Sequence, residues 1–254
     1  MENLIEVKNL TKIFGNIKAV DNISFDIQKG EILGLVGESG SGKTTTGRIL
    51  LRLISATSGE VLYSGKNIFG LKNYELKKFR EESQIIFQDP YTSLNPRMRV
   101  GETIAEPLII HRSVEKDKIH DRIGELLSLV HLPPAYSQRY PHELSGGERQ
   151  RIGIARALAT NPKFIVADEP VSSLDVTVQA EILKLLQELK EKLGLTILFI
   201  AHDLMVVQNL CDRVIVMEKG KIVEKGTSEQ IFRKPSHPYT KILLGSIPRI
   251  VTIE

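Results

Sequence analysis

The chain has 254 residues, enough for one large α/β domain or two small ones, and its 41% hydrophobic and 26% charged residues are typical of a globular protein. A formal net charge of +3 is too small to indicate nucleic-acid binding, and none is expected. The single cysteine, Cys211, excludes an internal disulfide and a cysteine-ligated iron–sulfur cluster held by this chain alone.

The first part of the chain reads mainly as strands, because apolar and polar residues alternate or form short apolar runs. The apolar run at 31–37 is typical of a strand buried on both faces. A helix is expected directly after it, over 43–54. The other expected strands lie at 4–10, 20–27, 59–68 and 83–88, the last one stopped by Pro90.

From about residue 91 the pattern becomes helical. Residues 100–109 and 115–130 carry apolar side chains at helical spacing. Strands return at 163–168, 195–201 and 211–226, and an amphipathic helix with Val178, Ile182, Leu185 and Leu189 on one stripe follows the first of them. The apolar runs are too short to cross a bilayer, and the first ten residues lack a signal-peptide pattern, so work at a membrane would need another chain to span it.

Residues 37–44, GESGSGKT, match the phosphate-binding pattern G-x-x-x-x-G-K-[ST]. Glycines let the backbone wrap closely around phosphate oxygens, and the helix that follows directs its positive end at them. Lys43 would bridge the β- and γ-phosphates, and the Thr44 hydroxyl would bind Mg²⁺. Because a buried-type strand precedes the motif and a helix follows it, phosphate binding is favoured over a flexible Gly/Ser turn.

Polar side chains stand where three other strands end. Asp168 and Glu169 close one strand, in a place suited to holding Mg²⁺ and to polarising an attacking water. Gln88 and His202 end two more strands, where a γ-phosphate could sit. For these two, a solvated side chain at a strand end is an equally good interpretation of the local sequence.

Together these motifs resemble the ATP-binding subunit of ATP-binding-cassette (ABC) transporters, over essentially the whole chain. GESGSGKT resembles the Walker A loop, FIVADE the Walker B strand, and LSGGE at 144–148 the family signature. The resemblance implies an α/β fold: a P-loop NTPase core with an antiparallel β-subdomain and a helical insert. It also implies one domain over 1–254, with a core of 1–89 and 161–230, a helical subdomain of about 90–160 and a C-terminal segment of 231–254.

The resemblance assigns roles residue by residue. Glu169, His202 and Gln88 are the expected catalytic residues, in the Walker B, switch and Q-loop positions. Mg²⁺ is expected on Thr44, Gln88 and Asp168. The expected ATP-binding residues are Phe14, Gly37, Glu38, Ser39, Gly40, Ser41, Gly42, Lys43, Thr44, Thr45, Ser145, Gly146, Gly147 and Asp175.

The signature stretch raises the question of why one chain has two phosphate-suited loops. In ABC ATPases, two subunits pack head-to-tail, and each signature loop closes on the nucleotide of its partner. The resemblance therefore implies that Ser145 and Gly147 serve the ATP of a second subunit, identical or related. The charged run after them reads as a solvated helix face, and we expect that of Gln150 and Arg151.

The stretches QDPYTSLNPRM, from Gln88, and HPYTKILLGSIP, from His237, resemble the peptide/nickel group of importers. The resemblance implies an ATPase peripheral to the cytoplasmic face of the cell membrane, with two membrane-spanning permease subunits and an extracytoplasmic solute-binding protein. Di- or oligopeptides are the expected cargo, and nickel, oligosaccharide or a soluble non-transport role are the alternatives. Tyr91, Leu94 and Met98 are expected to form an exposed surface for the permease, unless they pack inside the helical insert.

Overall fold

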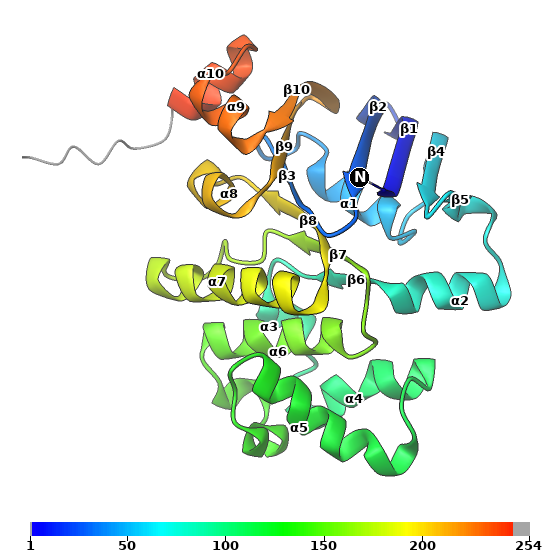
Figure 1. The fold of residues 1–254 in the computed structure, drawn as a ribbon, viewed down its shortest axis with the longest axis vertical. Helices are drawn as coiled ribbons and strands as arrows, with labels where there is room; N and C mark the ends of the chain where they lie inside the picture. The colour runs from blue at the N-terminus through cyan, green and yellow to red at the C-terminus, as the bar shows by residue number, and fades with distance from the viewer. Residues whose placement is uncertain (1, 246–254) are drawn as a thin grey trace, which may run out of the picture. The chain divides into compact units, whose positions relative to one another are not determined.

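The computed structural model describes residues 2–245, except for the side chain of Pro90. The chain folds as two compact units. The first combines Met1–Phe69 with Leu198–Glu254, and the second is Gly70–Ile197. In Figure 1 the first unit takes the blue and the orange-to-red ends of the colour scale, and the second takes most of the cyan-to-yellow range.

An antiparallel sheet in the first unit has the strand order β2-β1-β4-β5. Its strands are β1 (Asn3–Phe14), β2 (Ile17–Gln28), β4 (Ser58–Tyr63) and β5 (Lys66–Asn67). Side chains that alternate between the two faces of β1 bury Ile5 and Val7, and regular alternation would next bury Asn9. Asn9 is exposed instead, and the next buried residue is Leu10. The register shifts between Val7 and Leu10, where Asn9 takes a φ of 49°, and this bulge returns Leu10 to the buried face. The expected antiparallel β-subdomain is confirmed.

The first unit also contains the parallel pair β3 (Ile32–Val36) and β9 (Arg213–Glu218), with β10 (Lys221–Thr227) antiparallel to β9. All five β3 residues are buried, as the apolar run predicted. β8 (Thr196–Ala201) crosses the division between the two units. The helices of this unit are α1 (Lys43–Leu50), α8 (Leu204–Leu210), α9 (Ser228–Arg233) and α10 (Pro238–Gly245); the 3₁₀ turn η1 (Ile68–Gly70) leads to the second unit.

Helix α1 is shorter than expected. The pattern predicted helix to residue 54, but the helix ends at Leu50. Arg52 adopts a left-handed φ of 52°, which is incompatible with a continuing α-helix.

The second unit is built around the parallel pair β6 (Ser83–Ile86) and β7 (Phe164–Asp168). Between residues 90 and 160 the described chain forms helices and 3₁₀ turns, which confirms the helical insert (Figure 1). The helices are α2 (Asn73–Glu82), α3 (Pro90–Ser93), α4 (Val100–His111), α5 (Ile119–Leu129), α6 (Gly146–Leu158) and α7 (Val176–Leu193); the turns are η2 (Lys116–Lys118), η3 (Pro134–Gln138) and η4 (Pro141–Glu143).

Helix α2 was not predicted. Of its ten residues only Phe79 is buried, so it lacks the apolar stripe that reveals α5 and α7. No helix among residues 2–245 combines the length and the apolarity needed to span a bilayer.

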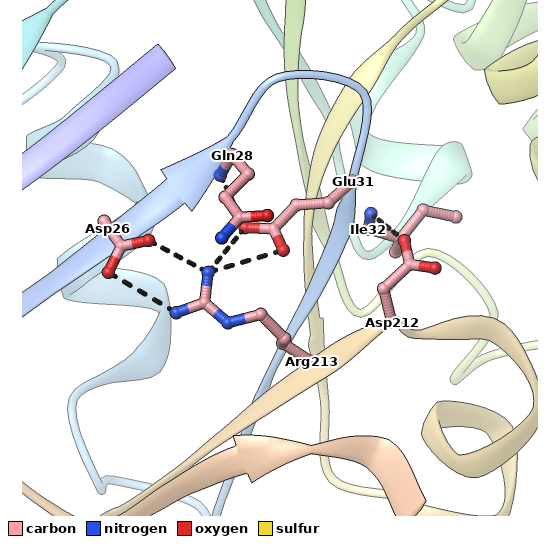
Figure 2. A network of polar contacts seen from close by, with 6 residues as sticks. All are labelled: Asp26, Gln28, Glu31, Ile32, Asp212 and Arg213. Carbon is pink, nitrogen blue, oxygen red and sulfur yellow. Dashed lines mark hydrogen bonds and ion pairs between the residues drawn. The ribbon is translucent and has the colours of Figure 1, made fainter. Parts of the chain in front are cut away.

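An ionic network ties the β2–β3 turn to the start of β9 in the first unit (Figure 2). Arg213 donates to Asp26 (Nη1 to Oδ2, 2.9 Å) and to Glu31 (Nη1 to Oε1, 3.2 Å). Glu31 also accepts the backbone N–H of Gln28 at 2.6 Å, and Asp212 accepts that of Ile32 at 2.8 Å. Burial raises the pKa of the Glu31 carboxyl, whereas the charge of Arg213 acts in the opposite direction. The turn is therefore held by a single cation between two carboxylates.

We expect Arg213→Met to lower the free energy of unfolding by about 2–3 kcal/mol, because it leaves two neighbouring carboxylates without their cation. The control is Arg233→Met, since the side chains of Arg233 and its partner Glu229 are 75% and 73% exposed. Such exposed pairs contribute about 0–1 kcal/mol. Urea unfolding followed by circular dichroism would measure both variants. Equal losses in the two would contradict a structural role for the network.

Candidate functional site

The glycine-rich loop lies between β3 and α1, the strand-loop-helix context that the sequence predicted. Gly37 and Gly42 have φ angles of 150° and 103°. A Cβ on Gly37 would collide with the carbonyl oxygen of Met217 in β9, and one on Gly42 with that of Ala19 in β2. Only glycine fits at these two positions, and the two strands thereby fix both ends of the loop.

Lys43 is 4% exposed and points back into the loop. Its Nζ donates to the carbonyl oxygens of Gly37 (2.7 Å) and Glu38 (2.8 Å). The Ser41 hydroxyl is buried and has no hydrogen-bond partner in the described structure. A buried ammonium, an unpaired hydroxyl and the positive end of α1 form a donor set that fits a phosphate chain.

The other residues of this unit that the sequence predicted to bind ATP or act in catalysis lie partly in the loop and in α1, and partly at the ends of other strands. Glu38, Ser39 and Gly40 form its exposed tip, and Thr44 and Thr45 are in the first turn of α1. Phe14 ends β1 and is 48% exposed, and the Nζ of Lys12 lies 4.7 Å from its ring centroid. His202 is exposed immediately after β8.

In the second unit, the structure brings Gln88 and Glu169 together. The Nε2 of Gln88 donates to Oε2 of Glu169 at 3.0 Å. The contact arises because the parallel strands β6 and β7 end at the same edge of their sheet. Asp168, 5% exposed, is the last residue of β7, and Glu169 follows it with a left-handed φ of 47°. Strained backbone of this kind is concentrated at functional sites.

The signature residues and Asp175 are also brought together. Ser145 caps α6, with its Oγ accepting the N–H of Glu148 while the Glu148 carboxylate accepts the N–H of Ser145. Asp175 caps α7, with its Oδ1 accepting the N–H of Val178. A Cβ on Gly147 would lie 2.5 Å from Cγ1 of Val178, so the glycine allows the two helix N-termini to pack closely.

The expectation of a solvated face at Gln150 and Arg151 is wrong. Gln150 is 1% exposed, and Arg151 pairs with Glu181 at 2.9 Å and donates to the carbonyl of Val130. Helix α6 packs against α3, α4, α5 and α7, so little of its surface remains for solvent. The local charge pattern could not reveal this, because the covering helices come from distant parts of the sequence.

Two arginines that the sequence analysis did not select connect α6 to α3. Arg149 donates through Nε and Nη2 to the carbonyl of Leu144, and its guanidinium lies 4.9 Å from the Tyr91 ring centroid. Arg156 donates to the carbonyl of Ser93 and lies 5.7 Å from the ring of Phe87. Their i, i+7 spacing on one helix face is the signal that could have identified them.

The surface expected at Tyr91, Leu94 and Met98 needs correction. Tyr91 is 67% exposed, but Leu94 is 3% exposed and belongs to the core, and Met98 is half-buried. Leu94 follows the last residue of α3, where the backbone leaves the helix in an extended conformation (φ −105°, ψ 133°).

The sequence of this chain matches known families and proteins along most of its length. Residues 20–172 match the family described as "ABC transporter", and residues 223–252 match "Oligopeptide/dipeptide transporter, C-terminal region". The chain is 54% identical to "Oligopeptide transport ATP-binding protein OppF" of Bacillus subtilis (strain 168), covering 97% of this chain and 83% of that protein. It is 53% identical to "Dipeptide transport ATP-binding protein DppF" of Lactococcus lactis subsp. cremoris (strain MG1363), covering 97% and 82%.

A solved structure has the same fold. It is described as "Dimeric structure of a post-hydrolysis state of the ATP-binding cassette MJ0796 bound to ADP and Pi", with a TM-score of 0.79 and 32% identity over 88% of this chain and 98% of that one. The fold, the loop geometry and these similarities agree with one another. The chain belongs to the ABC transporter family and is an ATP-binding ATPase of that family.

Proposed function

We propose that this ATPase powers the import of di- or oligopeptides through two separate membrane-spanning subunits, which it binds at the cytoplasmic face of the membrane. An extracytoplasmic solute-binding protein would deliver the cargo. The observation that carries the proposal is the similarity over 97% of the chain to proteins named for oligopeptide and dipeptide transport. The separate match of residues 223–252 to an oligopeptide/dipeptide transporter region supports the same cargo.

Gly37–Thr45 binds the ATP phosphates in this proposal, with backbone N–H groups, Lys43 and the Ser41 hydroxyl as donors. Phe14 stacks on the adenine. Thr44, Gln88 and Asp168 offer hydroxyl, amide and carboxylate oxygens, the ligand types that suit Mg²⁺, and the ion would offset negative charge developing on the phosphates.

Glu169 polarises the attacking water. The hydrogen bond from Gln88 orients its carboxylate and uses the amide nitrogen of Gln88, so the amide oxygen can still serve as a metal ligand. His202 contacts the γ-phosphate. Hydrolysis then requires a negative charge on Glu169, since a neutral amide of the same shape cannot draw a proton from water.

We expect Glu169→Gln to lower the ATP hydrolysis rate about 10²–10⁴-fold and to leave ATP binding intact. The control is Glu191→Gln on the exposed side of α7, which should hydrolyse ATP normally. In vesicles that contain the membrane subunits and the binding protein, uptake of a labelled tripeptide should follow the hydrolysis rate.

Two results would contradict these assignments. A Glu169→Gln rate within a factor of two of wild type would exclude Glu169 as the principal base. Transport of nickel or an oligosaccharide, without transport of peptides, would overturn the proposed cargo and leave the ATPase assignment standing.

The proposed working form is a head-to-tail dimer with an identical or related subunit. Ser145 and Gly146 are exposed at the N-terminus of α6, where helix N–H groups and the dipole favour an anion. In the dimer, this end and Asp175 close on the ATP held by the partner. The dimeric state of the similar cassette bound to ADP and Pi supports the arrangement. Loss of the γ-phosphate after hydrolysis would release the subunits.

Mixing two inactive variants would test the shared sites. Lys43→Ala removes ATP binding in one chain, and Ser145→Arg blocks the signature loop of the other. In a mixed dimer one site carries both lesions and the other carries neither, so hydrolysis should return to a substantial fraction of the wild-type rate. The measurement is ATPase activity after mixing. No recovery, with mixed dimers confirmed by crosslinking, would argue against sites made between chains.

Tyr91 and Phe87 form the exposed apolar surface that we assign to the membrane subunits. They are 67% and 39% exposed, and Arg149 and Arg156 hold their rings against α6. Exposed apolar side chains on such a fixed segment are typical of a protein interface.

We expect Tyr91→Asp to retain ATP binding but to lose assembly with the membrane subunits, because it places a charge in an apolar contact. Tyr74→Asp, at a tyrosine that is 76% exposed on α2, is the matched control and should assemble normally. Leu94→Asp should instead destabilise the fold, since it buries a carboxylate. Co-purification with the membrane subunits measures the first effect. Normal assembly of Tyr91→Asp would rule out this surface.

A further inference from the structure

The C-terminal segment reaches the glycine-rich loop within the first unit. The backbone N–H of Glu38, at the exposed loop tip, donates to the hydroxyl oxygen of Tyr239 at 3.1 Å. Tyr239 belongs to the sequence HPYT at the start of α10, and 201 residues separate the two partners. This tyrosine has no part in the chemistry described above.

The start of α10 is fixed by hydrogen bonds to β10. The carboxylate of Glu224 accepts the backbone N–H of Ser236 at 2.7 Å and that of His237 at 3.1 Å. Nδ1 of His237 in turn accepts the N–H of Tyr239 at 3.2 Å. Tyr239 is 9% exposed, whereas Ile242 on the same short helix is 69% exposed. The hydroxyl therefore sits on a helix start that hydrogen bonds attach to β10.

The loop tip is the part of the loop that the strands do not fix. Collisions with Met217 and Ala19 constrain Gly37 and Gly42, but residues 38–40 are exposed. The peptides flanking Glu38 are held from two sides: its carbonyl oxygen accepts Nζ of Lys43, and its N–H donates to Tyr239. Burial raises the pKa of the Tyr239 hydroxyl, whose oxygen accepts this N–H through a lone pair.

We propose that Tyr239 is a positioning residue for ATP, which acts by holding the Glu38 backbone, and through it Lys43, in the conformation that receives the phosphates. This inference rests on the proposed assignment of Gly37–Thr45 to ATP. A loop that is ordered before binding loses less conformational entropy when the nucleotide arrives, and affinity rises accordingly. The C-terminal segment thereby contributes to the nucleotide site from outside the Walker motifs.

The test is Tyr239→Phe, which removes the hydroxyl and keeps the ring. A neutral hydrogen bond contributes enough to predict about a three- to tenfold rise in the Kd and KM for ATP. The kcat should stay within about twofold, because Glu169 and Gln88 are untouched. Hydrogen exchange at the Glu38 amide should accelerate, and exchange in β3 should not.

Tyr74→Phe is the matched control and should leave the Kd, KM, kcat and hydrogen exchange unchanged. Glu224→Gln should raise KM in the same direction, since it weakens the support of Tyr239.

Lys43→Ala distinguishes a failure of the ATP assignment of the loop from a failure of the role of Tyr239. If this variant binds ATP like wild type, the assignment of the loop to ATP fails, and the inference fails with it. If Lys43→Ala loses ATP binding while Tyr239→Phe keeps the wild-type KM and Glu38 exchange, the role of Tyr239 alone is overturned. A fall in kcat at unchanged KM would also overturn it, because the hydroxyl would then act on the chemical step.

Discussion

The constraint on which the proposed nucleotide site depends is the close approach of backbone to backbone at the two ends of the glycine-rich loop. The carbonyl oxygens of Met217 and Ala19 occupy the space where side chains of Gly37 and Gly42 would be. Because both carbonyls belong to strands, the two ends of the loop cannot move without disturbing a sheet. This holds Lys43 and the first turn of α1, which follow directly after Gly42. The geometry of the loop ends is therefore a property of the packed first unit, and the exposed tip at residues 38–40 is the part that the strands leave free.

In the second unit, close packing at a glycine likewise positions two helix N-termini. Ser145 and Asp175 cap two helices whose ends pack together through Gly147 and Val178, so the N-termini of α6 and α7 lie side by side. Arg149 adds a link from the carbonyl of Leu144, next to Ser145, to the ring of Tyr91. Arg149 thus connects the surface proposed for the membrane subunits with the start of the helix proposed to meet a partner's nucleotide.

Polar contacts between segments far apart in the sequence stabilise the first unit around its loop. Arg213 joins β9 to the β2–β3 turn that leads into the loop, and Tyr239 joins α10 to the loop tip. Both contacts use partly or fully buried groups, for which hydrogen bonding offsets the cost of desolvation. The ionic network and the C-terminal segment therefore support two parts of the same strand-loop-helix element, the turn before β3 and the loop tip.

The sequence by itself determined the family, the fold class, the glycine-rich loop at 37–44 between a strand and a helix, and the position of Gln88, Asp168 and Glu169 at strand ends. These features depend on local patterns: glycine spacing and apolar runs act through neighbouring residues. Only the tertiary structure decided that Gln150 and Leu94 are buried, that Arg149 and Arg156 hold α3, that α2 is a helix with one buried side chain, and that Tyr239 meets Glu38. Burial and long-range hydrogen bonds depend on which distant segments cover a residue, and a local pattern carries no information about that packing.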